Sequence, residues 1–125
     1  MKKLLLMILV LTAFIISCGQ KKASNNDVIK IGVIAPLTGE LAQYGTAVKN
    51  GVVLKIDEIN ANNGINGKKI ELVIADSKGD SQEAVNIFKK MVSQDKIDLL
   101  IGEVISSASL AISDLAQAAK VPMIT

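Results

Sequence analysis

The chain has 125 residues, enough for at most one compact domain, with 14 basic and 12 acidic residues, one cysteine and no histidine. All the basic residues are lysines and none stands in a run longer than a pair, so we expect no nucleic-acid partner. A single cysteine excludes a disulfide framework, and the lack of histidine removes the commonest metal ligand, so we expect no metal site.

The first eighteen residues predict an export signal with a lipid attachment site. Lys2 and Lys3 precede an apolar run from Leu4 to Ile16 that only Thr12 interrupts. As a helix with ~1.5 Å rise per residue, this run covers about 20 Å of a hydrocarbon core of roughly 30 Å, which indicates a signal peptide rather than a membrane span. The run ends in a sequence that resembles the bacterial lipobox, which implies cleavage before Cys18 and lipidation of that cysteine. The alternatives are an ordinary secreted protein with a cysteine near its cleavage site, and a cysteine buried in the core.

Three segments follow from this interpretation: a lipoprotein signal peptide (1–17), a lipidated cysteine with a polar tether (18–27) and a folded region (28–125). The tether would lift the folded region off the bilayer. Because Lys2 and Lys3 leave with the signal peptide, the mature chain would carry 12 lysines and 12 acidic residues and no formal net charge.

From residue 28 onward, short apolar runs alternate with longer segments of helical period. The runs at 28–34, 70–75, 97–101 and 121–124 are apolar at nearly every position, as expected of strands covered on both faces. The segments between them predict helices with one buried stripe each. The stripes are Leu41, Tyr44, Val48, Val52, Ile56 and Ile59; Ala84, Val85, Phe88, Met91 and Val92; and Ala108, Ile112, Leu115, Ala116 and Ala119. This alternation predicts an α/β fold with a doubly wound, Rossmann-like parallel sheet and helices on both of its faces.

Three patterns mark helix ends. Gly64 is placed for a left-handed cap after the first helix, and Asp80 and Glu83 resemble a capping box before the second. Ser106 or Ser107 is placed as the N-cap of the third helix.

Ligands of open α/β sheets bind at the carboxyl ends of the strands, near the point where the strand order reverses. This rule selects the loops at 35–40, 76–81 and 103–107. In the last loop, free N–H groups and the positive end of the helix dipole would attract a carboxylate or phosphate, with Ser106 or Ser107 as an extra donor. The alternative is a serine that only caps its own helix. Tyr44 either completes the core stripe or places its ring against a ligand.

No motif supports a nucleotide cofactor or covalent catalysis. Asp76 ends the second strand, where a dinucleotide fold places its ribose-binding carboxylate, but the GxGxxG and Walker motifs are absent. Ser106 has no GxSxG elbow around it and no histidine to activate its hydroxyl. We therefore expect no cofactor and no enzymatic activity.

Several short stretches, taken in their order and spacing, resemble the periplasmic substrate-binding proteins of branched-chain amino-acid ABC transporters, which are periplasmic binding proteins of type I. The similarity covers essentially all of the chain after the tether. The stretches are IGVIAPLTG (31–39), QYG (43–45), DEINA (57–61), GINGKKIEL (64–72), IG (101–102), SS (106–107) and VP (121–122).

The resemblance implies a two-lobed protein that closes on a free amino acid, with residues 28–125 as the N-terminal part of lobe I and lobe II beyond the end of the chain. It implies that Ser106, with Ser107 beside it, binds the ligand carboxylate and that Tyr44 lines the pocket. Because further binding residues would lie past Thr125, we expect this chain alone to bind amino acids weakly or not at all.

The resemblance also implies partners and a location. The protein would be a monomer, lipid-anchored to the bacterial cell membrane and facing the periplasm or cell exterior, that delivers Leu, Ile or Val to a membrane permease. Three alternatives remain: a sensory ligand-binding module of a receptor, a binding protein for amides, urea or aromatic acids, and a lipid-anchored hydrolase that would need a histidine elsewhere.

Overall fold

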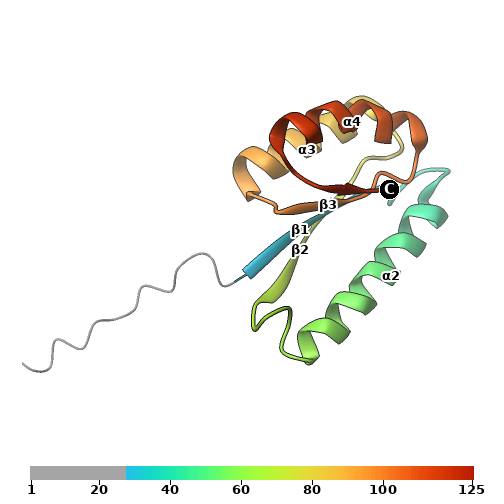
Figure 1. Ribbon diagram of the computed structural model, residues 1–125. Helices are drawn as coiled ribbons and strands as arrows, with labels where there is room; N and C mark the ends of the chain where they lie inside the picture. Colours follow the sequence, from blue (N-terminus) through green and yellow to red (C-terminus); the bar gives the residue numbers. More distant parts are fainter. Residues whose placement is uncertain (1–27) are drawn as a thin grey trace, which may run out of the picture.

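The computed structural model describes residues 28–125, which form a four-stranded parallel sheet with helices on both faces (Figure 1). In chain order the elements are β1 (Val28–Ala35), α2 (Ala42–Ala61), β2 (Lys69–Asp76), α3 (Ser81–Lys90), the π-helix η2 (Met91–Asp95), β3 (Leu99–Ile101), α4 (Ser106–Ala119) and β4 (Met123–Ile124). The predicted α/β class and parallel sheet are confirmed. The proposed signal peptide, Cys18 and the tether lie outside the described residues.

The strand order is β2-β1-β3-β4, and every neighbouring pair is parallel. β1 pairs with β2 over its whole length, from Val28 opposite Lys69 to Ala35 opposite Asp76. On its other side β1 pairs with β3 only over 31–33. The chain therefore leaves β1 toward one side of the sheet and later returns to the other, so the strand order reverses between β1 and β3.

β3 begins two residues later than predicted, because Asp98 takes the place of a ladder residue. The carboxylate of Asp98 accepts a hydrogen bond from the backbone N–H of Lys30 at 2.8 Å, and its own N–H donates to the carbonyl of Lys30 at 2.7 Å. Asp98 is thus bound to Lys30 through both its side chain and its backbone, and the regular β1–β3 pairing begins after it.

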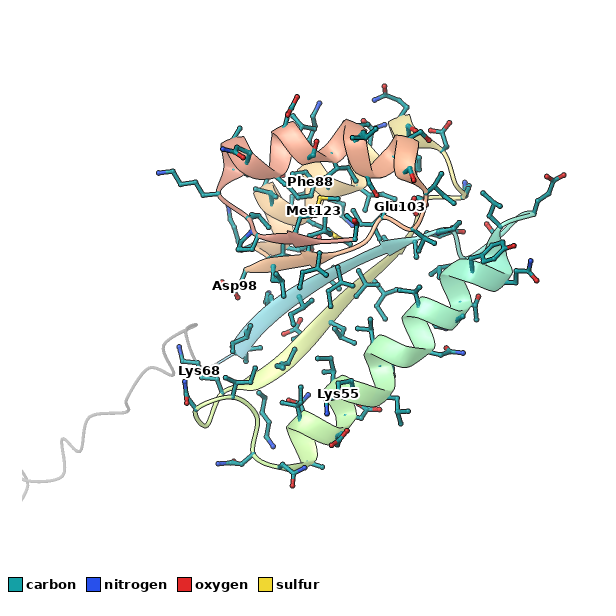
Figure 2. All side chains as sticks on the ribbon, turned by 45° about the vertical axis from the view of Figure 1, so that its right-hand side comes forward. Lys55, Lys68, Phe88, Asp98, Glu103 and Met123 are labelled. Carbon is teal, nitrogen blue, oxygen red and sulfur yellow. The ribbon has the colours of Figure 1, made fainter. Side chains whose placement is uncertain are left out.

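The main core lies on the face covered by α3 and α4. Figure 2 shows Phe88 and Met123 between these helices and the sheet. Most of the predicted stripes of the two helices are buried or partly buried, and the exception is Ala119, which is exposed at the last turn of α4. The buried members of this core are Ile34, Ala84, Phe88, Met91, Ile97, Leu100, Ala108, Ile112 and Ala116.

α2 covers the other face only in part, which corrects the predicted stripe. Ile56 is buried against Ile31 and Ile70, with Val52 and Ile59 packed beside it. The stripe residues of the N-terminal half are exposed: Leu41 is 36%, Val48 37% and Tyr44 54% exposed.

The helix ends agree with the predictions in part. α2 ends at Ala61, and Asn63 and Gly64 both adopt left-handed backbone, with φ of 72° and 74°. Asp80 caps α3 by accepting from the N–H of Glu83 at 2.7 Å. The reciprocal half of the capping box is absent, because the N–H of Asp80 donates to the carbonyl of Ser77 instead.

Candidate ligand-binding site

The carboxyl ends of β1, β2 and β3 lie at the same edge of the sheet, as parallel strands require. The loops after β1 and β3 flank the point where the strand order reverses, the place where α/β sheets bind ligands. Gly102, the first residue after β3, has a φ of +118°, and a Cβ there would lie 2.1 Å from the carbonyl oxygen of Ile34. Only glycine lets β3 leave the sheet so close to β1.

Asp76, at the end of β2, holds the loop that follows β1. Its carboxylate accepts hydrogen bonds from the N–H of Leu37 at 2.7 Å, the N–H of Lys78 at 2.8 Å and the hydroxyl of Thr38. Partial burial of this carboxyl raises its pKa, but the hydrogen bonds, led by that of Thr38, outweigh burial and hold the pKa of Asp76 below its usual value. The carboxylate of Asp76 thus ties the loop after β1 to the loop after β2.

Glu103 holds the loop that follows β3. It is 2% exposed, and its two carboxylate oxygens accept from the hydroxyl of Ser77 at 2.8 Å and from the N–H of Ile105 at 3.0 Å. The hydroxyl of Ser109 donates to the carbonyl oxygen of Glu103 at 2.6 Å. In Figure 2 Glu103 lies at the start of α4, at the end of the sheet opposite Lys68 and Asp98.

α4 begins at Ser106, and the predicted serine N-cap is wrong. The N-cap is Ile105 in extended conformation, and no side chain caps the helix. The first N–H that bonds within the helix is that of Ser109, to the carbonyl of Ile105 at 2.9 Å, so α4 itself leaves the N–H groups of residues 106–108 unused. This N-terminal corner of α4, formed by residues 106–108, therefore offers hydrogen-bond donors at the positive end of a helix dipole.

A pocket of about 500 Å³ opens beside this corner. Most of the side chains around it are aliphatic, and Ser106 lies in its wall close to the backbone of 102–104. The residues that line it are Val48, Ile101, Gly102, Glu103, Val104, Ser106, Ser109, Leu110, Ile124 and Thr125. An apolar pocket with donors at one end suits a small molecule that carries an anionic group and an aliphatic part.

The three predicted ligand-binding residues occupy different positions. Ser106 lines the pocket, whereas Ser107 does not and has its hydroxyl 3.4 Å from that of Ser81 at the start of α3. Tyr44 lies in the first turn of α2, half exposed, one helical turn before Val48 of the pocket wall. Cys18, the predicted lipidation site, lies outside the described residues.

The sequence did not single out Glu103 or Ser77. The selected loops contained both residues, but an acidic residue after a strand is normally exposed. Among residues 28–125, no three metal-binding side chains lie together, and no helix is long and apolar enough to cross a membrane.

Comparison with known proteins agrees with the fold. The chain is 42% identical over 97 residues to the Leu/Ile/Val-binding protein BraC3 of Rhizobium johnstonii, an alignment that covers 78% of this chain and 26% of that protein. The crystal structure of the branched-chain amino acid transporter substrate-binding protein LivJ of Streptococcus pneumoniae, in complex with isoleucine, superposes with a TM-score of 0.74 at 42% identity, covering 77% of this chain and 28% of that one.

A third relative contains a different ligand. The solute-binding protein of an ABC transporter from Rhodopseudomonas palustris, in complex with 3,4-dihydroxybenzoic acid, superposes with a TM-score of 0.72 at 32% identity, covering 78% of this chain and 26% of that one.

Residues 28–125 match the family model described as periplasmic binding protein, and the chain belongs to this family. The resemblance found in the sequence is confirmed. Membership in a family of substrate-binding proteins gives no support to the hydrolase alternative. The chain spans about a quarter of the length of the relatives it matches (26% of BraC3).

Proposed function

We propose that the complete protein is the extracytoplasmic substrate-binding component of an ABC transporter that imports a branched-chain amino acid. The observation that carries this proposal is the uncapped N-terminus of α4 at one end of a pocket with aliphatic walls. A carboxylate fits the donors, and the side chain of Leu, Ile or Val fits the aliphatic wall. Relatives that are named or crystallised as binders of these amino acids support the same choice.

In this proposal Ser106 binds the ligand carboxylate through its hydroxyl and backbone N–H. The N–H of Ser107 adds a second donor, although the hydroxyl of Ser107 lies near Ser81. Tyr44, half exposed beside the pocket wall, covers the ligand when a second lobe closes over it. The ligand ammonium is bound by that second lobe, so residues 28–125 alone would bind amino acids weakly.

The cellular setting is proposed on the same basis. The protein is exported, lipid-anchored at Cys18 to the cell membrane, monomeric, and passes its ligand to a membrane permease. Its 28–125 region is the N-terminal part of lobe I. A sensory module would use the same site but present it to a receptor, and a signalling domain in the same gene product would identify that case.

An aromatic acid is the second candidate ligand, because the R. palustris relative binds 3,4-dihydroxybenzoic acid. It shares the carboxylate with an amino acid but lacks the ammonium group. The corner at α4 would accept either ligand, so a direct comparison of the two classes is needed.

The test is thermal unfolding of the complete mature protein, prepared without lipid, against single amino acids and aromatic acids. A ligand at about 1,000 times its dissociation constant adds about 4 kcal/mol to the free energy of unfolding. We expect this for Leu, Ile or Val, and we expect Ser106→Ala to remove most of it. Ser93→Ala is the matched control, because the hydroxyl of Ser93 bonds to carbonyls of its own helical segment. The proposal fails if no branched-chain amino acid raises the melting temperature.

A further inference from the structure

Glu103 is the only charged side chain that is buried in residues 28–125. Burying a carboxylate is costly unless both oxygens are hydrogen-bonded, and here both are, to Ser77 and to Ile105. The proposed ligand contacts leave this group without a role. The carboxylate of Glu103 accepts hydrogen bonds from the loop after β2 and from the loop after β3, so it links the two loops beside the pocket.

The partners of Glu103 show what it holds in place. Ile105 is the last residue before α4, so the bond to its N–H sets the direction in which the helix begins. Ser77 lies on the loop after β2, and its hydroxyl also accepts from the N–H of Gly79 at 3.2 Å. The N–H of Ser77 donates to the carbonyl of Ala35 at 3.0 Å, so this loop is itself fixed to the end of β1.

Glu103 also explains why no serine caps α4. The loop into the helix is braced by the carboxylate at Ile105 and by the hydroxyl of Ser109 on the carbonyl of Glu103. The hydroxyl of Ser106 is therefore not consumed as a cap and stays in the pocket wall. The N–H of Ile105 is satisfied internally, while the N–H groups of the next residues stay available.

We propose that Glu103 is a positioning residue, which fixes the N-terminus of α4 so that Ser106 and the adjacent N–H groups meet a ligand carboxylate in a preformed geometry. This inference rests on the proposed function, because it assigns the corner to a carboxylate. Glu103 acts through Ile105 and α4 and does not bind the ligand itself, since it is 2% exposed and each of its oxygens is hydrogen-bonded within the protein.

The test measures leucine affinity by calorimetric titration of the complete protein. We expect Glu103→Ala to weaken binding by about tenfold or more, in line with the loss of two buried hydrogen bonds. Glu103→Gln should stay within about threefold of the wild type, because the amide oxygen still accepts from Ile105. Ser77→Ala should weaken binding in the same direction as Glu103→Ala, and it carries the test if Glu103→Ala does not fold.

A double-mutant cycle separates positioning from a merely structural role. If Glu103 acts through the corner, Glu103→Ala combined with Ser106→Ala should lose less affinity than the two separate losses predict together. Asn60→Ala is the matched control at the other end of the sheet, because the side chain of Asn60 bonds both the N–H and the carbonyl of Ile70 at 2.8 Å. That variant should lower the melting temperature, leave leucine affinity unchanged and combine additively with Ser106→Ala.

The outcomes are distinct. A wild-type protein that binds leucine, with Glu103→Ala and Ser77→Ala that only lower the melting temperature as Asn60→Ala does, overturns the positioning role and leaves the proposed function intact. A loss of affinity in Glu103→Gln equal to that in Glu103→Ala also overturns it. A wild-type protein that binds no amino acid overturns both proposals.

Discussion

The two faces of the sheet are covered to different degrees, although the helices that cover them have similar apolar stripes. α3 and α4 bury side chains such as Phe88 and Ile112 in a continuous core. α2 buries a small cluster around Ile56 and leaves Val48, one side of the pocket, 37% exposed. One face therefore holds most of the buried apolar surface, whereas the other keeps apolar surface open beside the proposed carboxylate corner.

This difference separates stability from function. Burial of apolar area is the main favourable term in folding, so the α3–α4 face should dominate the free energy of unfolding. Open apolar surface stabilises little in the free chain but remains available to a ligand or to another part of the protein. The corner at Ser106 lies between the face that α3 and α4 cover and the apolar surface that α2 leaves exposed.

The largest expected effect is on the closed face. Phe88 is 2% exposed, and Phe88→Ala should lower the free energy of unfolding of the complete protein by about 4 kcal/mol, since it removes a ring and leaves a cavity. Ile56, 7% exposed in the smaller cluster, should cost only about 2 kcal/mol when replaced by alanine. Urea unfolding of both variants measures the difference. A cost for Ile56→Ala equal to or above that for Phe88→Ala would contradict the unequal division of the core.

The next effect concerns how closely α2 approaches the loop that follows β1. A Cβ on Gly45 would lie 2.0 Å from the carbonyl oxygen of Pro36, whereas a Cβ on Gly51, in the same helix, would have no atom within 4 Å. Gly45→Ala should therefore destabilise the protein by about 1–3 kcal/mol through overpacking. Gly51→Ala should stabilise it by up to about 1 kcal/mol through helix propensity. If Gly45→Ala and Gly51→Ala change the melting temperature in the same direction, the close contact of α2 with Pro36 does not determine the effect of Gly45→Ala.

The sequence predicted the fold because strand and helix periods are local signals. Four apolar runs became four parallel strands, and the helices fell between them. The coverage of α2 was not predictable in the same way. Periodicity shows that Tyr44, Val48 and Ile56 share one face of a helix, but it cannot show whether another element lies opposite that face.

The site was predictable in location but not in its internal bonding. The rule for open sheets selected the loops that surround the pocket, and Ser106 lies in its wall. The role of Glu103 was missed because it depends on Ser77, which is 26 residues away in the sequence. The N-cap was misplaced by one or two residues, because bonds from Ile105 and Ser109 to Glu103 brace the start of α4 in place of a serine cap.

The smallest expected effect is a pH dependence at the loop edge. Because hydrogen bonds hold the pKa of Asp76 below its usual value in the folded protein, the unfolded chain binds a proton there more readily. The stability that Asp76 contributes is therefore present above the usual carboxyl range and is lost as the pH falls through the folded pKa. The effect is modest because this carboxylate is only partly buried. Asp76→Asn should lower stability at neutral pH and approach the wild type as the pH falls through the folded pKa of Asp76. Asp57→Asn is the control, because Asp57 is an exposed carboxylate of α2. Urea unfolding at several pH values measures the difference in the free energy of unfolding between Asp76→Asn and the wild type. If this difference stays constant from neutral to acid pH, the charge of Asp76 does not hold the loop that follows β1.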